Sequence, residues 1–349
     1  MNNESITTKP IGKNHTLLEK FEVGLKDNFP ACVELRAVHH GESIIHYQNP
    51  RPKISIRSNI VRSVYGLLLP FIPRLKLSTL DSLHGKWNVR SVTKSVLSAL
   101  VGITIEQNIL KSLDIKLGDF FNNLDKEKSA ITLHQLLSMT SGFPYIDGVS
   151  PMIRLLTSKN WIQHILQIPL QSPPGKEYIY STASSHLMAG VLNQLLNSRL
   201  LQFAQEHLFT PLGIDPPQWE RDPQGILFGG TNLFLSIDDM IKFGMFYLKN
   251  GVWNHEKLLS HQWVKSSITP HSRIDDQYQY GYGWWLRYFP NSKNQGNTFV
   301  FGAYGFGGQR IYVVPQLDLV ITAISMLDLW AHTEILDNLV GEYLLPAVR

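Results

Sequence analysis

Ser91 and Lys94 are the two side chains of this sequence whose spacing most clearly predicts chemistry. No other lysine has a serine three positions before it. The apolar residues that follow predict a buried helix opened by Ser91, and residues three apart on a helix share a face, so the amine can approach the hydroxyl. Burial lowers the pKa of a lysine, and the free N–H groups at a helix start favour negative charge. The pair therefore predicts a serine nucleophile with a lysine base, and hence a hydrolase.

A simpler interpretation is that Ser91 only caps this helix and that Lys94 is a solvated lysine of its first turn. A Ser-x-x-Lys sequence by itself recurs by chance, so other parts of the chain must decide between the two interpretations. The chain has no Gly-x-Ser-x-Gly motif, which argues against an α/β-hydrolase arrangement.

The elements that must position this pair come from both ends of the chain. A turn at residues 39–42 joins two β-prone segments into a hairpin, and a second pair is joined by a connection too short for a parallel crossover, so it is also antiparallel. The predicted strands are Cys32–Val38, Ser43–Tyr47, Arg310–Val314 and Leu319–Ser325, and the predicted terminal helices are Leu17–Lys26 and Leu327–Leu345.

The middle of the chain, from about Leu113 to Gln224, carries mostly helical patterns broken by prolines. This predicts a helical lobe (about 113–224) inserted in an α/β lobe, with residues 1–30 as an N-terminal tail and helix and residues 31–349 as the catalytic domain. Further along, Ser236 with Asp239 three residues later resembles a capping box and predicts a helix start ahead of Met240.

Composition excludes several classes of protein. The 349 residues are 43% hydrophobic and carry a net charge of +4 with the basic residues scattered, which predicts a folded protein without a nucleic-acid partner. Cys32 is the sole cysteine, so an intrachain disulfide and a cysteine zinc site are excluded. Residues 1–20 lack a signal-peptide pattern, which predicts a cytoplasmic location. The apolar run Val64–Ile72 is too short to span a membrane, so no transmembrane segment is expected.

Two further motifs follow the Ser-Lys pair. Residues 172–182 read SPPGKEYIYST, and residues 304–309 read YGFGGQ ahead of a predicted strand. With the segments at 136–143 (LLSMTSGF), 229–244 and 280–285 (YGYGWW), their order and spacing resemble the serine β-lactamase and penicillin-binding-protein superfamily. The likeness is greatest to its class C-like branch of esterases, D-aminopeptidases and nylon-oligomer hydrolases, and it runs from about residue 32 to 345. It implies an α/β (α+β) fold of the β-lactamase/transpeptidase type, an antiparallel sheet flanked by helices with an inserted all-helical lobe and the site between them.

The resemblance also implies roles for individual residues. Ser91 would be the acylated nucleophile, Lys94 its general base, and Tyr180 the group that exchanges protons with the nucleophile and the leaving group. Proximity to the lysine is expected to hold the phenol of Tyr180 closer to ionisation. Tyr178 is the competing tyrosine, but the following Ser-Thr places Tyr180 at the first position of a Tyr-x-Asn/Thr motif.

The resemblance further implies an oxyanion hole made by the backbone N–H of Ser91 and one from the turn at Gly307 and Gly308, with Gly308 preferred. Two departures from the family pattern matter. Thr182 replaces the asparagine of Tyr-x-Asn, and Gly305-Phe306-Gly307 replaces Lys-Thr-Gly, so a cation for a substrate carboxylate is missing.

These residues predict a serine hydrolase that forms an acyl-enzyme with a small ester or amide and is not an efficient β-lactamase. The alternatives are a D-aminopeptidase or weak β-lactamase of the same fold, and an inactive binding or scaffold relative. No cofactor or metal is expected, because the separation of His255-Glu256 from His261 does not match His-Glu-x-x-His. The oligomeric state is not predicted. Four aromatic residues could line an acyl pocket or belong to the core: Trp87, Tyr145, Trp284 and Phe306.

Overall fold

A central antiparallel sheet organises the molecule. The computed structural model describes residues 7–8, 14–60, 63, 81–290, 296–328 and 334–349; the apolar run Val64–Ile72 lies outside them. Every neighbouring pair of strands in the sheet is antiparallel. In spatial order the nine strands are β1 (Thr7–Thr8), β3 (Glu42–Gln48), β2 (Cys32–His39), β14 (Leu319–Ser325), β13 (Gln309–Val314), β12 (Thr298–Gly305), β11 (Trp285–Phe289), β10 (Tyr278–Tyr280) and β9 (Ser272–Arg273).

Short strands and helices surround this sheet. A three-stranded sheet consists of β4 (Ser82–Leu83), β5 (Lys86–Asn88) and β6 (Phe234–Leu235), and β7 (Val252–Trp253) pairs with β8 (Glu256–Lys257). The helices are α1 (His15–Asn28), α4 (Val92–Glu106), η1 (Leu117–Asp119), α5 (Lys126–Ser129), α6 (Leu133–Leu137), α7 (Val149–Thr157), α8 (Trp161–Gln167), α9 (Thr182–Leu195), α10 (Leu200–Ala204), η2 (Gln205–Phe209), α11 (Ile237–Leu248), α12 (His261–Ser267), η3 (Pro315–Leu317), α13 (Glu334–Leu339), η4 (Val340–Leu344) and α14 (Leu345–Val348).

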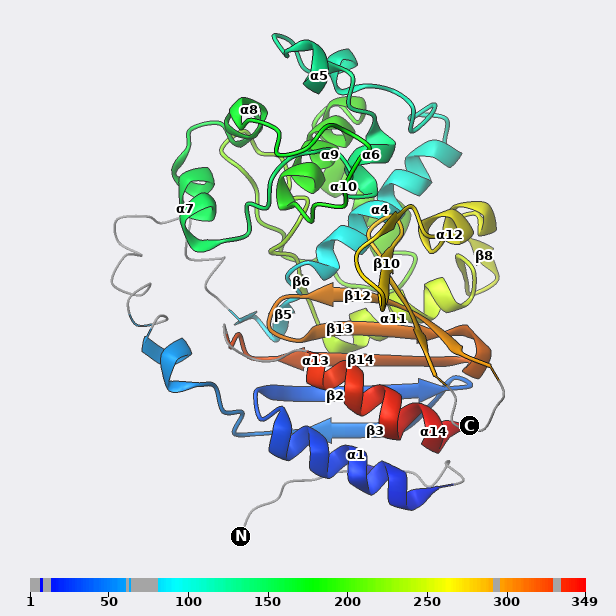
Figure 1. Ribbon diagram of the computed structural model, residues 1–349. Coiled ribbons are helices and arrows are strands. Elements are labelled where there is room, and N and C mark those ends of the chain that lie inside the picture. Colours follow the sequence, from blue (N-terminus) through cyan, green and yellow to red (C-terminus); the bar gives the residue numbers. More distant parts are fainter. Residues whose placement is uncertain (1–6, 9–13, 61–62, 64–80, 291–295, 329–333) are drawn as a thin grey trace.

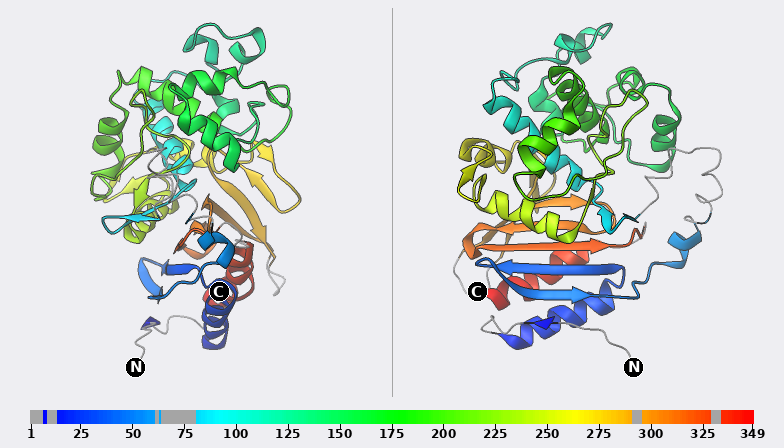
Figure 2. Two further views of the ribbon diagram at one scale, coloured as in Figure 1. Left: turned by 90° about the vertical axis from the view of Figure 1, so that its left-hand side faces the viewer. Right: turned by 180° about the vertical axis from the view of Figure 1, so that it is seen from behind.

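Helices cover both faces of the sheet. Helices α1, α13 and α14 lie on one face, while α11 lies on the other, as the front and back views show (Figures 1 and 2). Every residue of β13 and β14 is buried, which explains why these central strands are mostly apolar along their length rather than alternating. Two buried clusters result, one on each face, and the larger continues through α4 into the helices α6 to α10.

The predicted strands of both pairs are confirmed. In the first pair the turn between β2 and β3 is His40-Gly41, with φ of 49° and 78°, as a type I′ hairpin turn requires. In the second pair β13 and β14 are antiparallel and are joined through η3. The predicted N-terminal helix is α1, and the predicted capping box opens α11, with Ser236 and Asp239 bonded reciprocally.

The predicted first residue of the C-terminal helix is wrong. The sequence suggested Leu327, but Leu327 and Asp328 are not helical and α13 begins at Glu334. Tertiary hydrogen bonds hold this stretch instead: the Asp328 carboxylate accepts from the hydroxyls of Ser55 and Ser58 at 2.8 and 2.5 Å. These contacts are long-range in sequence, so local helical periodicity could not foretell them.

Helix α4 is central to the molecule. It lies between the helices α5 to α10 and the sheet (Figure 1), and its residues 92–104 are all buried. The helices of residues 126–204 gather beyond α4, in the part of the chain where the sequence predicts a helical lobe. Among the helices of the described residues, none has the length and apolarity needed to cross a bilayer.

Candidate functional site

The segment that leads into α4 holds Ser91 in a constrained backbone. Arg90 has a left-handed φ of 51°, a conformation that costs a non-glycine residue energy. The side chain of Asn88 accepts from the Arg90 N–H at 3.1 Å and donates to Asn232 at 3.0 Å. Ser91 follows at the N-cap position of α4 without a side-chain capping bond. The predicted helix start is confirmed, and the hydroxyl of Ser91 does not cap the helix.

Lys94 brings its amine to the Ser91 hydroxyl. The Nζ atom lies 3.0 Å from Ser91 Oγ, 2.9 Å from Thr182 Oγ1 and 2.8 Å from the carbonyl oxygen of Gly230. A Cβ on Gly230 would lie 2.6 Å from the Thr182 methyl and 3.2 Å from the amine, so glycine is needed for the close approach of this carbonyl. Lys94 is only 3% exposed, and the interpretation of a solvated first-turn lysine is therefore wrong.

Burial controls the charge of Lys94. Desolvation lowers the pKa of its ammonium, the carboxylate of Asp147 raises it, and the balance leaves the pKa at about 8. A lysine with such a pKa is neutral in a substantial fraction of molecules near neutral pH, so it can accept a proton. Lys94 lies in a helix whose residues 92–104 are all buried, and the amine itself is enclosed by Thr182, Gly230 and Tyr180.

Tyr180 lies beside the Ser-Lys pair. The ring centroid of Tyr180 is 4.7 Å from Lys94 Nζ, and its phenol is near enough to Ser91 for that side chain to lower the phenol's pKa. Burial first, then Tyr280 and Asp147, raise the pKa of this phenol well above its ordinary value. The expectation that Lys94 would bring the phenol closer to ionisation is wrong, because desolvation by burial dominates the shift and Lys94 is not among its causes. Tyr180 is therefore a neutral hydrogen-bonding group.

The competing tyrosine, Tyr178, has no hydrogen bond to Ser91 or Lys94 among the described residues. Tyr178 packs against Tyr280 with the ring centroids 5.5 Å apart. Burial raises the pKa of its phenol, and its hydroxyl is buried with no hydrogen-bond partner among the described residues. The structure thus brings together Ser91, Lys94 and Tyr180, and the sequence preference for Tyr180 over Tyr178 agrees with this geometry.

Asp147 is a polar neighbour of the site that the sequence did not suggest. Its carboxylate accepts a hydrogen bond from the Thr182 hydroxyl and a second, of 3.2 Å, from the Thr182 backbone N–H. Asp147 stands in the loop before α7, 35 positions from its partner at the start of α9. The sequence shows Thr182 where the Tyr-x-Asn motif of the resembling superfamily has asparagine. Nothing in the sequence predicts that Asp147 pairs with this threonine.

The turn between β12 and β13 lies against the segment that carries Ser91. A Cβ on Gly305 would lie 2.4 Å from the Val89 carbonyl oxygen and 3.2 Å from the Arg90 Cβ. The turn is type II, with a φ of 81° at Gly307 and a 3.3 Å bond from the Gly308 N–H to the Gly305 carbonyl. The N–H of Gly308, the preferred oxyanion donor in the sequence interpretation, is therefore occupied within the turn.

Arg310 holds this turn from beneath and was also missed. Its Nη1 donates to the carbonyl oxygens of Gly305 at 2.8 Å and Gln309 at 3.1 Å. The guanidinium is buried and lies 4.4 Å from the ring centroid of Tyr304. A buried guanidinium costs desolvation free energy unless it is bonded; here Nη1 is bonded to the two carbonyls, while Nε is buried with no hydrogen-bond partner among the described residues.

The aromatic residues divide into core and site neighbours. Trp284 is fully buried, and its ring is parallel to that of Phe243 at 5.9 Å between centroids, so it belongs to the core. Tyr145 and Phe306 are each 55% exposed. Trp285, which the sequence did not single out, lies 5.9 Å from Tyr180 between centroids. Trp87 is half-buried against the larger core.

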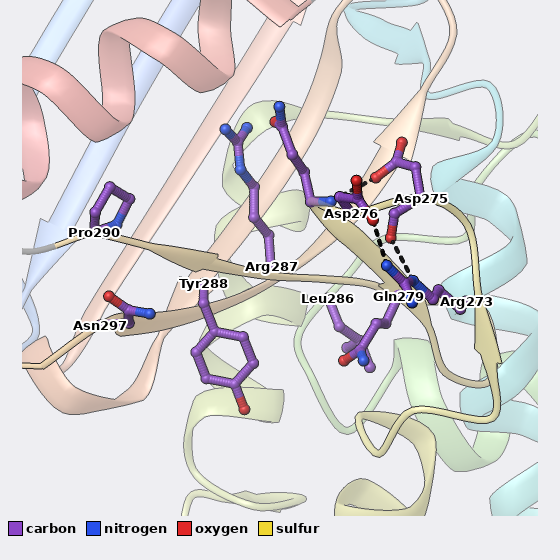
Figure 3. A pocket seen from close by; sticks show the side chains of 10 residues that line it. Arg273, Asp275, Asp276, Gln279, Leu286, Arg287, Tyr288, Pro290 and Asn297 are labelled. Carbon is purple, nitrogen blue, oxygen red and sulfur yellow. Dashed lines mark hydrogen bonds and ion pairs between the residues drawn. The ribbon is translucent and has the colours of Figure 1, made fainter.

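A separate pocket lies at the far edge of the sheet, on β9, β10 and β11 (Figure 3). It has a volume of about 580 Å³ and is lined mostly by polar side chains. Its acidic side is already paired, because Asp276 forms an ion pair with Arg273 (Figure 3). Ser91, Lys94 and Tyr180 are not among its lining residues, so this pocket is distinct from the candidate site.

A metal centre has no basis in the described part of the chain. No group of three or more His, Cys, Asp or Glu side chains there could hold an ion. His255 lies in the turn between β7 and β8, while His261 is the first residue of α12. The two histidines thus belong to different elements, which agrees with the mismatch between their spacing and a His-Glu-x-x-His motif.

Comparisons with known proteins agree with this arrangement. Residues 85–340 match the family model described as Beta-lactamase. The chain is 21% identical over 250 residues to an uncharacterised protein of Alkalihalophilus pseudofirmus, a match that covers 67% of this chain and 72% of the relative.

Solved structures show the same fold at low identity. The chain is similar to a Bacillus anthracis protein assigned as a 6-aminohexanoate-dimer hydrolase (18% identity, TM-score 0.68, covering 93% of this chain and 80% of that one). It is also similar to EstCE1, a hydrolase with promiscuous acyltransferase activity (16%, TM-score 0.65, 93% and 98%). A third match is simvastatin synthase (LovD) from Aspergillus terreus (17%, TM-score 0.63, 94% and 96%). At these identities the likeness concerns the fold alone.

Proposed function

Because this chain belongs to the β-lactamase family, we propose that it is a serine hydrolase that forms an acyl-enzyme at Ser91 with a neutral ester or amide. One observation carries the proposal: the amine of a buried Lys94 lies 3.0 Å from the hydroxyl of Ser91. The inactive-scaffold alternative is disfavoured, because a buried lysine without a task would cost desolvation free energy.

In the first half of the proposed reaction, neutral Lys94 takes the proton from Ser91 Oγ as that oxygen attacks the acyl carbonyl. The C–O bond to serine forms, and the carbonyl oxygen becomes negatively charged. When the tetrahedral intermediate collapses, the leaving alkoxide or amine takes a proton from the neutral phenol of Tyr180, and the neighbouring Lys94 ammonium returns a proton to the phenolate, so that both groups end neutral. In the second half, water replaces the leaving group and the same steps run in reverse.

We propose that the oxyanion is stabilised by the backbone N–H groups of Ser91 and Phe306. Gly308, the sequence candidate, uses its N–H within the turn. Among the described residues, no backbone acceptor is bonded to the N–H of Ser91 or of Phe306. The contact between Gly305 and the Val89–Arg90 segment places the turn next to the nucleophile. Two preorganised donors on a developing charge are the usual device for acyl transfer.

The substrate class follows from the same turn. Where β-lactam enzymes of the resembling superfamily have Lys-Thr-Gly, this chain has Gly305-Phe306-Gly307, and Phe306 is largely exposed. An exposed aromatic ring in the turn that lies against the Val89–Arg90 segment suits an apolar, uncharged acyl or leaving group better than a carboxylate. We also propose that about residues 113–224 form a helical lobe inserted in the α/β lobe.

The test is hydrolysis of uncharged p-nitrophenyl acyl esters and anilides by the intact chain, with mass spectrometry of a quenched reaction. An adduct of acyl mass on the peptide that contains Ser91 would support the proposal. Nitrocefin serves as the contrasting substrate: slow but measurable turnover of nitrocefin without ester hydrolysis would favour the alternative of a weak β-lactamase. Absence of turnover and of adduct with all of these compounds would contradict the proposal.

A further inference from the structure

The acid at position 147 has a task in the proposed reaction, and this inference rests on that proposed function. We propose that Asp147 is a positioning residue which, through the hydroxyl of Thr182, directs the lone pair of neutral Lys94 at Ser91. Asp147 itself touches neither Ser91 nor Lys94 through a hydrogen bond. Its effect is transmitted by the direction in which one hydroxyl hydrogen points.

The hydroxyl of Thr182 has a single hydrogen, and Asp147 receives it. An ionised carboxylate can only accept hydrogen bonds, so in the bond between Thr182 Oγ1 and Asp147 Oδ1 the threonine must be the donor. The second carboxylate oxygen accepts from the Thr182 backbone N–H at 3.2 Å, which fixes the orientation of the carboxylate. Toward Lys94, 2.9 Å away, the threonine oxygen can therefore only accept.

The other neighbours of Lys94 complete the argument. The Gly230 carbonyl, at 2.8 Å, is also an obligate acceptor. A neutral amine on a lysine has two N–H hydrogens and one lone pair. The two hydrogens are used by Thr182 and Gly230, and the lone pair is left for the hydroxyl of Ser91 at 3.0 Å. This is the orientation that a general base needs. If the threonine hydrogen were free, it could donate to the amine and occupy the lone pair.

Asp147 also acts on Lys94 through its charge, which gives the inference a second readout. The other groups that face the amine are uncharged: the hydroxyls of Ser91 and Thr182, the carbonyl of Gly230 and the ring of Tyr180. Among the described residues, the Asp147 carboxylate is the one charge that shifts the pKa of Lys94, and it raises it. Its neutralisation must therefore lower the pKa of the base.

The decisive variant is Asp147→Asn, which keeps the shape of the side chain. An asparagine oxygen that accepts from the Thr182 N–H turns its amide NH₂ toward Thr182 Oγ1, so the hydroxyl hydrogen is driven toward Lys94. We expect kcat/KM for a p-nitrophenyl ester to fall ~100-fold, the scale of a lost general base. The rise of kcat/KM with pH should move to lower pH than in the unaltered chain. A structural role alone would not move that pH profile.

A double-mutant cycle with Thr182→Val separates orientation from general damage. Valine has no hydroxyl, so Asp147 can no longer direct a hydrogen. In a chain that already carries Thr182→Val, the further change Asp147→Asn should alter kcat/KM by less than about threefold. The distant exposed substitution Asp27→Asn on α1 is the charge-matched control. Should Asp147→Asn not fold, Asp147→Ala replaces it in the same cycle, because it too frees the threonine hydrogen.

The inference would be overturned if Asp147→Asn lowered kcat/KM by the same factor in the presence and absence of Thr182→Val. It would also be overturned if Asp147→Asn left kcat/KM unchanged in a chain that retains Thr182. A wild-type chain that forms no acyl adduct at Ser91 and hydrolyses no ester would instead be a failure of the proposed function. Covalent labelling of Ser91 in each variant therefore precedes the rate measurements and keeps the two failures distinct.

Discussion

The guanidinium of Arg310 donates to the carbonyl oxygen of Gly305 at 2.8 Å and thereby fixes the turn that lies against the Val89–Arg90 segment. The same nitrogen reaches the Gln309 carbonyl at 3.1 Å. One buried side chain thus holds both ends of the turn that contains Phe306. Since one of the proposed oxyanion donors is a backbone N–H in that turn, we expect the arginine to affect the proposed reaction by keeping this donor in place.

Replacement of this arginine should reduce catalysis more than binding. For Arg310→Met we expect kcat for an acyl ester to fall by at least ~10-fold with little change in KM, because a mobile donor stabilises the transition state less. The matched control is Arg287→Met, since Arg287 also lies over aromatic rings but bonds to Tyr278 rather than to the turn. Equal effects of the two substitutions would contradict the role given to Arg310.

The pH dependence of the reaction follows from Lys94. Only the neutral amine can take the proton of Ser91, and the pKa of Lys94 is about 8. The neutral fraction grows as the pH rises through that value, so kcat/KM should increase with pH and level off above it. The measurement is a profile of kcat/KM between about pH 6 and 10. A rate that is constant across this range, or that falls through pH 8, would mean that Lys94 is not the base.

Trp285 offers a test of the acyl pocket. It lies next to Tyr180 and stacks on Tyr304, with the rings 11° from parallel and 5.5 Å apart. We expect Trp285→Ala to lower kcat/KM for phenylacetyl esters several-fold more than for acetyl esters, because an aromatic contact is worth about 1 kcal/mol. The control is Trp253→Ala in β7, on the short hairpin after α11. Parallel losses for both esters would place the acyl group elsewhere.

The core around α4 predicts the stability of the fold independently of the reaction. Leu100 is fully buried in the larger cluster. Leu100→Ala should lower the free energy of unfolding by about 3 kcal/mol, from lost apolar burial and the cavity left behind. Urea denaturation followed by fluorescence measures this value. The exposed substitution Val23→Ala is the comparison, and a similar loss there would show that burial does not set the difference.

Some of this site could be read from the sequence because it is local. Ser91 and Lys94 are three positions apart, and the apolar run after them is long enough to predict a buried helix. The strands β13 and β14 could also be predicted locally, since both are mostly apolar and β-branched and are separated by one short connection.

The missed parts are those made by contacts between distant segments. Asp147 meets Thr182 across 35 positions, and no pattern near either residue announces the partner. Arg310 is a basic residue at the start of a strand, which in a sequence is typical of a solvent-facing side chain; only the sheet shows it buried beneath the turn. The start of the C-terminal helix failed for the same reason, since Asp328 is held by Ser55 and Ser58.

The measurement that tests the central claim most directly is covalent labelling of the intact chain with a fluorophosphonate probe, followed by peptide-resolved mass spectrometry. The reagent reports an activated serine without knowledge of the substrate. The geometry of Ser91 and Lys94 predicts a single adduct on Ser91, which Ser91→Ala abolishes and Lys94→Met strongly slows. No adduct under conditions that label a control serine hydrolase, or an adduct on another serine, would contradict the account.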